Sequence, residues 1–156
     1  MENLLIRIAK VLIVAALPVV EVRGAIPLGI IVYNINPILV FFISFLGNII
    51  PAPFILIFLN KLEHFLMRIS VTKEFYIKYI NYIRRKSRKY IEKYGFWGLA
   101  LFVAIPLPST GVWTGSLAAY VFGVDISRAL KAIILGSLMA STIVMILTLI
   151  FNITLT

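Results

Sequence analysis

The segment PVVEVRGAIPLG, residues 18–29, places a carboxylate and a guanidinium inside apolar sequence. These two groups belong to Glu21 and Arg23, and no other charge occurs between them and Asn60. Three uncharged runs cover residues 24–60, 95–124 and 132–156. Each run is longer than the roughly 20 apolar residues that cross a bilayer as a helix. The two charges therefore lie in a chain whose main solvent is lipid.

The overall composition supports the same conclusion. Hydrophobic residues make up 62% of the 156 residues and charged residues 13%, whereas about 25% charged residues is usual in soluble domains. We expect an all-α integral membrane protein. Because the chain has no cysteine and one histidine, disulfides, thiolate chemistry and a histidine metal site are excluded. We therefore expect no metal and no cofactor. Arg7 and Lys10 precede an apolar stretch as in a signal peptide, but without a convincing cleavage site we expect this segment to be retained.

Most of the positive charge is concentrated in residues 61–94. This segment holds ten of the fifteen Lys and Arg residues and three of the six acids. The positive-inside rule predicts that it is cytoplasmic, and its apolar residues recur at the spacing of amphipathic helices on a membrane surface. Thr72 is a candidate N-cap that would separate two such helices. The basic run RRKSRKY, residues 84–90, could neutralise nucleic-acid phosphates, but ordinary topology and attraction to anionic lipids explain it better, so no nucleic-acid partner is expected.

Two segments read as transmembrane helices, residues 37–60 and residues 126 to about 151. Two other apolar regions, 3–35 and 95–124, are interrupted in the middle by proline and glycine. The first interruption is the opening segment, and the second is IPLPSTGVWTG, residues 105–115.

The two halves can be aligned at an offset of 88 to 89 residues. ALP at 16–18 then matches AIP at 104–106, Asn36 matches Asp125, and GN at 47–48 matches GS at 136–137. If each interrupted region enters the membrane and leaves on the same side, the halves have opposite orientations. The predicted architecture is an inverted repeat of a re-entrant helical hairpin plus a transmembrane helix, with halves 1–60 and 95–156 joined by the basic amphipathic linker 61–94. Alternatively, residues 4–20 form a full transmembrane span with the N-terminus inside. This would place Arg7 and Lys10 on the cytoplasmic side, as the positive-inside rule prefers.

In the re-entrant arrangement the two interruptions meet near the membrane midplane. Ionisable groups there cost roughly 2.5–3.5 kcal/mol each to insert and generally mark substrate or ion pathways. Arg23 suits an anion, and Glu21 in a low-dielectric cavity can exchange a proton near neutral pH. The alternative is that the two residues pair with each other or with the broken backbone and only hold the loop in shape.

The second interruption supplies hydroxyl groups and a helix N-terminus. Ser109 or Thr110 could cap a half-helix that begins near Gly111, and Pro27 is expected near the start of the half-helix in the first hairpin. Two helix N-termini and an arginine in one place would form an anion site. The predicted substrate-binding residues are Glu21, Arg23, Gly24, Pro27, Pro106, Pro108, Ser109, Thr110, Gly111, Trp113 and Thr114.

These motifs resemble a known family. PVVEVRGAIPLGI, the following GN helix and IPLPSTGVWTGSLAA are similar to sequences of the small multidrug export proteins. The arrangement is also distantly similar to the DedA/VTT membrane proteins, which are implicated in moving lipids between leaflets. The second interruption, residues 105–115, lacks the basic residues that DedA proteins have in this region. The resemblance implies a transporter or lipid flippase whose site lies between the tips of the two hairpins, that is, between the interruptions at 18–29 and 105–115. Glu21 and Arg23 would be the acidic and basic residues of the first tip.

The functional expectation is a multi-pass cell-membrane transporter or lipid flippase/scramblase, proton-coupled through Glu21, with an anionic or amphipathic substrate. The alternative is a non-transporting structural or regulatory protein that binds anionic lipid or a partner through its basic linker. Membrane lipids are expected partners, and because two spans and two hairpins make a thin bundle, a homodimer is expected. No enzyme is expected, since no nucleophile with its base and no phosphate-binding glycine motif is evident.

Overall fold

The computed structural model describes residues 3–66, 70–107 and 110–155. These residues form helices and no strands, so the all-α prediction is confirmed for the described chain. The elements are α1 (Leu4–Ala16), α2 (Glu21–Pro27), the π-helix η1 (Leu28–Val32), α3 (Pro37–Ile49), α4 (Pro51–Leu66), α5 (Ser70–Ala104), α6 (Val112–Val121) and α7 (Ile126–Leu155).

Two helices are long and apolar enough to cross a membrane. The first, Pro37–Leu59, comprises α3 and the first part of α4; it has 23 residues and a peak mean hydropathy of 2.2. The second, Ile126–Thr154, lies in α7; it has 29 residues and a peak mean hydropathy of 2.5. Only 28% and 39% of the residues in these windows are buried, so most of each helix surface is free to face lipid rather than a protein core. Both helices coincide with the spans predicted from sequence.

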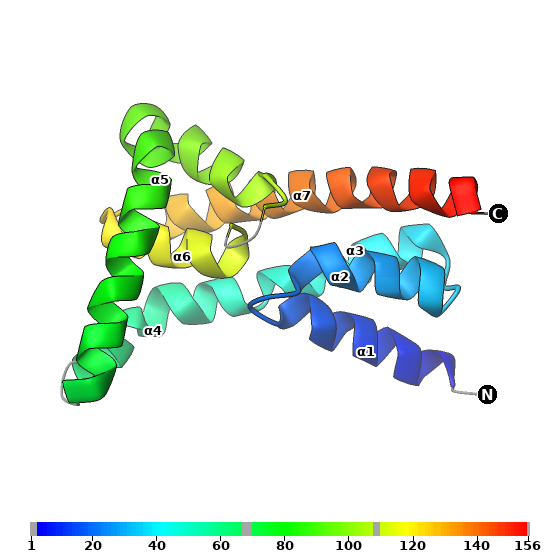
Figure 1. The fold of residues 1–156 in the computed structure, drawn as a ribbon, viewed down its shortest axis with the longest axis horizontal. Coiled ribbons are helices and arrows are strands. Elements are labelled where there is room, and N and C mark those ends of the chain that lie inside the picture. Colours follow the sequence, from blue (N-terminus) through cyan, green and yellow to red (C-terminus); the bar gives the residue numbers. More distant parts are fainter. Residues whose placement is uncertain (1–2, 67–69, 108–109, 156) are drawn as a thin grey trace.

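The first hairpin consists of α1, a short turn at residues 17–20, and α2 with η1 returning beside α1 (Figure 1). Val11 and Ala15 of α1 and Val22 and Ile26 of α2 are buried in one cluster. The interruption is shorter than predicted, because the helix resumes at Glu21.

Pro27 corrects a second expectation about this hairpin. It lies at the end of α2 and not near the start of the half-helix. Proline cannot donate a backbone hydrogen bond, and the helix loosens directly after it into the wider π-helix of η1.

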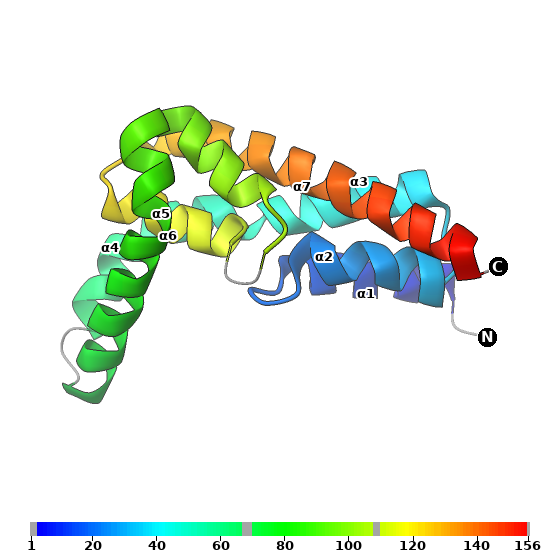
Figure 2. The same cartoon turned by 45° about the horizontal axis from the view of Figure 1, so that its top comes forward.

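The second hairpin is formed by the last part of α5 and by α6. Gly95, with φ 51° and ψ −117°, kinks α5, and residues 96–104 then lead to the loop before α6. Figures 1 and 2 show the two hairpins approaching from opposite ends of the molecule, with their connecting turns adjacent part-way along α7.

Several residues that the sequence alignment pairs lie in similar surroundings. Gly47 packs so closely that an added Cβ would lie 2.7 Å from the Leu12 carbonyl oxygen, and at Gly136 it would lie 2.5 Å from that of Ala100. The carboxamide of Asn36 caps the start of α3. Asp125, 89 residues later, caps α7 by accepting from the backbone N–H of Arg128. The two halves therefore share local features at matching positions.

The described parts of the basic linker are helical, but the helix boundary differs from the prediction. α4 continues to Leu66 and α5 begins at Ser70, so Thr72 lies inside a helix and is not an N-cap. The first part of α5, residues 70–94, lies crosswise at one end of the bundle (Figure 1, green). It is amphipathic, because Ile83, Ser87 and Ile91 are buried on one side.

Candidate functional site

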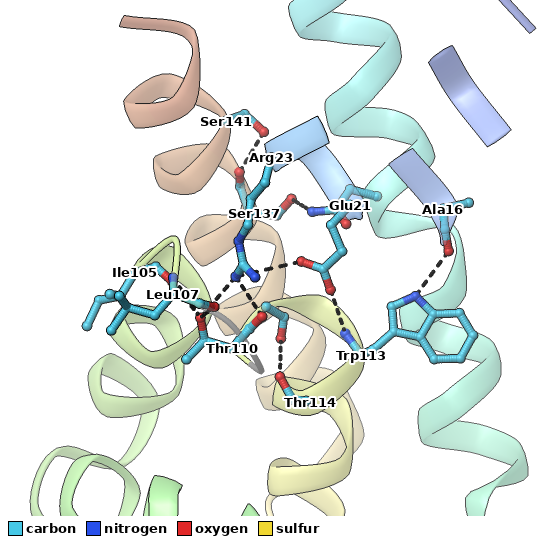
Figure 3. A network of polar contacts seen from close by, with 12 residues as sticks. Ala16, Glu21, Arg23, Ile105, Leu107, Thr110, Trp113, Thr114, Ser137 and Ser141 are labelled. Carbon is cyan, nitrogen blue, oxygen red and sulfur yellow. Dashed lines mark hydrogen bonds and ion pairs between the residues drawn. The ribbon is translucent and has the colours of Figure 1, made fainter. Parts of the chain in front are cut away.

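Glu21 links the two hairpin turns. It adopts a left-handed backbone conformation, with φ 49°, and it is 2% exposed. Its side chain reaches the N-terminus of α6, where Oε1 accepts a hydrogen bond from the backbone N–H of Trp113 at 3.4 Å (Figure 3). Gly111, the N-cap of α6, has no side chain to cap this helix. A carboxylate from the first half therefore caps a helix of the second half.

The predicted cap of α6 is consequently wrong for Thr110. Its hydroxyl lies 2.6 Å from the carbonyl oxygen of Ile105 and 2.7 Å from that of Leu107. The loop curls back on itself, so this hydroxyl faces the preceding carbonyls and not the N–H groups of α6. Pro108 and Ser109, which were also predicted at the site, lie outside the described residues.

Arg23 reaches from α2 to the same loop. Its Nη2 donates to the carbonyl oxygen of Thr110 at 2.6 Å and to the Thr110 hydroxyl at 2.9 Å, and it lies 4.0 Å from Oε2 of Glu21. Its Nε is buried and has no hydrogen-bond partner among the described residues. The two charges thus pair with each other and hold the second loop, as the alternative interpretation of the sequence stated, while one Arg23 donor is unused.

Arg23 also lines a groove of about 390 Å³, which we call the arginine groove. Its other lining residues are Pro27, Ile31, Pro106, Val144, Leu147, Thr148 and Phe151. The hydroxyl of Thr148 bonds to the carbonyl oxygen of Val144 in its own helix. The groove therefore combines one cation with walls that are largely apolar.

A second groove, of about 330 Å³, lies between α4 and α6, and we call it the tryptophan groove. Its lining residues are Phe54, Ile55, Phe58, Leu59, Trp113 and Leu117. The indole N–H of Trp113 donates to the carbonyl oxygen of Ala16 at 3.0 Å, which fixes the ring against the first hairpin.

The two grooves are related by the sequence alignment. Ile55, Phe58 and Leu59 stand 89 residues before Val144, Leu147 and Thr148, which line the arginine groove. Each groove is thus built from matching positions of a long helix together with residues of a hairpin. The hairpin residue is the charged Arg23 in the arginine groove and the aromatic Trp113 in the tryptophan groove.

The remaining predicted residues have packing or hydrogen-bonding roles in the described chain. An added Cβ at Gly24 would collide with the Val20 side chain. Thr114 is buried, and its hydroxyl donates to the carbonyl oxygen of Gly111 at 3.4 Å. Among the described residues, no three Asp, Glu or His side chains come together as a metal site.

The sequence analysis missed the α7 side chains of the arginine groove. Val144, Leu147 and Phe151 are the same residue types as those that face lipid, so their pattern carries no distinguishing signal. It also missed a buried hydrogen bond of 3.0 Å from Asn48 Nδ2 to Ser137 Oγ. Here a signal existed, since an asparagine inside an apolar span needs a polar partner.

Comparison with known proteins identifies the family. A family model described as "Putative small multi-drug export protein" matches residues 21–143. This match covers most of the chain, from Glu21 through the second hairpin and into α7, so the chain belongs to this family. No curated protein and no solved structure matches the chain. The distant similarity to DedA/VTT proteins stays a prediction.

Proposed function

We propose that this member of the small multi-drug export family transports an amphipathic anion, bound with its charge at Arg23 and its apolar part in the arginine groove. The observation that carries the proposal is that the Arg23 guanidinium, which holds the loop before α6, also lines a largely apolar groove. Holding a charge at such a depth is costly. A guanidinium offers a planar fork that suits carboxylate, sulfonate or phosphate.

The membrane arrangement that we propose is the inverted repeat with re-entrant hairpins. α1 has 13 residues, so it is about 20 Å long at 1.5 Å per residue, which is less than the roughly 30 Å of a hydrocarbon core. The matching surroundings of Gly47 and Gly136 and of Asn36 and Asp125 support a repeat. This arrangement leaves Arg7 at the outer end, where its guanidinium donates to the carbonyl oxygen of Tyr33.

In this arrangement the two grooves open at opposite membrane depths, and the contact between the tips separates them. A substrate crossing between the grooves must part Glu21 from the N-terminus of α6 and Arg23 from Thr110. Protonation of Glu21 removes the charge that pairs with Arg23 and weakens the hydrogen bond that the carboxylate accepts from the Trp113 N–H. Proton exchange at Glu21 would thereby open the tips and free Arg23 for the substrate.

Transport by protein reconstituted in liposomes tests the proposal. Two amphipathic anions serve as probes: NBD-labelled phosphatidylglycerol, followed by dithionite protection, and the dye anilinonaphthalene sulfonate, followed by its fluorescence. Arg23→Ala should lower the rate at least tenfold, and Arg23→Lys should restore it partly, because lysine keeps the charge but loses the fork. Arg128→Gln removes an exposed cation of α7 and should leave the rate unchanged.

Glu21→Gln separates proton exchange from binding. Glutamine retains the size and a hydrogen-bond acceptor for the Trp113 N–H, but it cannot ionise. Probe binding should persist, while the pH dependence of transport should disappear. If the Arg23 and Glu21 variants lower only the amount of folded protein and leave transport per folded molecule unchanged, the pair is a structural clamp and the proposal is wrong.

A further inference from the structure

The first part of α5 has the orientation expected of a helix that lies along a membrane surface. Residues 70–94 run crosswise at the end of the bundle in both views (Figures 1 and 2). Ile83 and Ile91 of this segment pack into the cluster that also contains Ala129 and Ala132 of α7. Because α7 is long and apolar enough to cross a membrane, a helix lying across its first turns follows the membrane surface and does not enter it.

Three arginines converge on one side of this helix. Arg84, Arg85 and Arg88, together with Asn81 and Glu92, line a pocket of about 430 Å³. Glu92 neutralises one of the three, because Arg88 Nε lies 2.8 Å from its Oε2. In the part of the chain that the structure describes, no ion pair is made by Arg84 or Arg85, so the pocket keeps two uncompensated positive charges.

We propose that this arginine pocket binds the phosphate group of an anionic membrane lipid. Arginine forks match phosphate oxygens in geometry and charge. A basic cluster on a surface helix lies at the depth of the lipid headgroups, where the negative surface potential of anionic lipids attracts cations. Tyr79, Tyr82 and Tyr94 of the same segment are exposed, and tyrosine is enriched at this interface. The inference is independent of whether the tip site transports anything.

The geometry favours a lipid over a nucleic acid. The three arginines occupy little more than one helical turn, and the same helix is fixed against the end of the bundle through Ile83 and Ile91. Such a site accommodates one headgroup beside the membrane plane. A nucleic acid would need a longer track of cations along its backbone.

Binding to the full-length chain in detergent tests the proposal. The probes are dioctanoyl-phosphatidylglycerol, dioctanoyl-phosphatidylcholine, inorganic phosphate and a single-stranded 20-mer DNA. The double variant Arg84→Gln/Arg85→Gln should bind the phosphatidylglycerol at least tenfold more weakly, while phosphatidylcholine should not bind the parent protein. Arg84→Lys/Arg85→Lys keeps the charge and the helix but loses the forks, so its affinity should be intermediate.

The matched control is Arg128→Gln/Lys131→Gln, which removes two exposed cations from the start of α7 at the same end of the bundle. It should change the affinity for phosphatidylglycerol less than twofold. Equal weakening by both glutamine pairs would overturn the proposal in favour of general charge attraction. Tighter binding of inorganic phosphate or of the DNA than of phosphatidylglycerol would overturn it in favour of a free-anion or nucleic-acid site.

Discussion

At the scale of single residues, the contact between Glu21 and Gly111 joins the two halves. Both have positive φ, 49° for Glu21 and 124° for Gly111. A left-handed conformation costs a residue with a side chain roughly 1–2 kcal/mol. For Glu21 this cost is offset because its carboxylate reaches the N–H of Trp113, which would otherwise be unsatisfied in an apolar environment.

Gly111→Ala should therefore destabilise the protein strongly. The added Cβ would overlap the Glu21 carboxylate, and alanine is strained at φ 124°, at a cost of order 1–3 kcal/mol before the overlap is counted. The expected result is a lower midpoint of thermal unfolding in detergent than in the parent protein.

Gly123→Ala is the matched control for this prediction. Gly123 also has positive φ, 63°, but an added Cβ meets nothing within 4 Å, so only backbone strain remains. In a Glu21→Ala background, Gly111→Ala should cost less than in the parent. An equal cost in both backgrounds would show that the Glu21 carboxylate does not occupy the N-terminus of α6.

At the scale of elements, α3 and α7 are joined by a polar contact inside an apolar interface. Asn48 and Ser137 are both fully or almost fully buried, and the carboxamide donates to the hydroxyl. Ser44 and Ser141, four residues from each, are buried on the same helices. A buried carboxamide pairs with a partner because lipid offers none, so this contact specifies how the two helices align.

A double-mutant cycle with Asn48→Ala and Ser137→Ala should show a favourable coupling. Hydrogen bonds between membrane helices average about 0.6 kcal/mol and reach about 1.7 kcal/mol. Reversible unfolding in mixed micelles measures the coupling. The cycle of Asn48→Ala with Thr142→Ala serves as a reference, because the Thr142 hydroxyl bonds to Leu138 in its own helix. If both cycles give the same value, the Asn48–Ser137 bond contributes nothing specific.

At the scale of the whole molecule, the described buried apolar residues form two cores, and each core holds one hairpin. One buried cluster joins α1, α2, η1 and α3 to the last part of α7, and the other joins α4, α5 and α6 to its first part. α7 therefore serves both cores, and the tips meet where the clusters adjoin. This division agrees with two similar halves packed around shared long helices. The homodimer expected from the sequence stays a prediction.

Cysteine labelling tests the proposed topology, because the chain has no cysteine of its own. Asn3→Cys and Lys78→Cys place single thiols at exposed positions at opposite ends of the molecule. In intact cells a membrane-impermeant maleimide should label position 3, and it should label position 78 only after permeabilisation. Labelling of position 3 only after permeabilisation would contradict the re-entrant first hairpin.

The amino-acid sequence by itself determined where the helices run and where they are interrupted. Long apolar runs predict the spans at 37–60 and 126–151, and proline, glycine and charge mark both turns, because these are local properties of the chain. The family resemblance came from the same motifs. The sequence also indicated that Glu21 and Arg23 belong together at an interrupted helix.

Only the tertiary structure decided what these residues contact. A cap of α6 comes from Glu21, which lies about ninety residues away in the chain, whereas local spacing favoured Ser109 or Thr110. The walls of the arginine groove are apolar residues of α7, whose types do not differ from those facing lipid. Periodicity reports which side of a helix is apolar, whereas grooves and caps across the chain depend on how separate helices pack, and that packing is a non-local property.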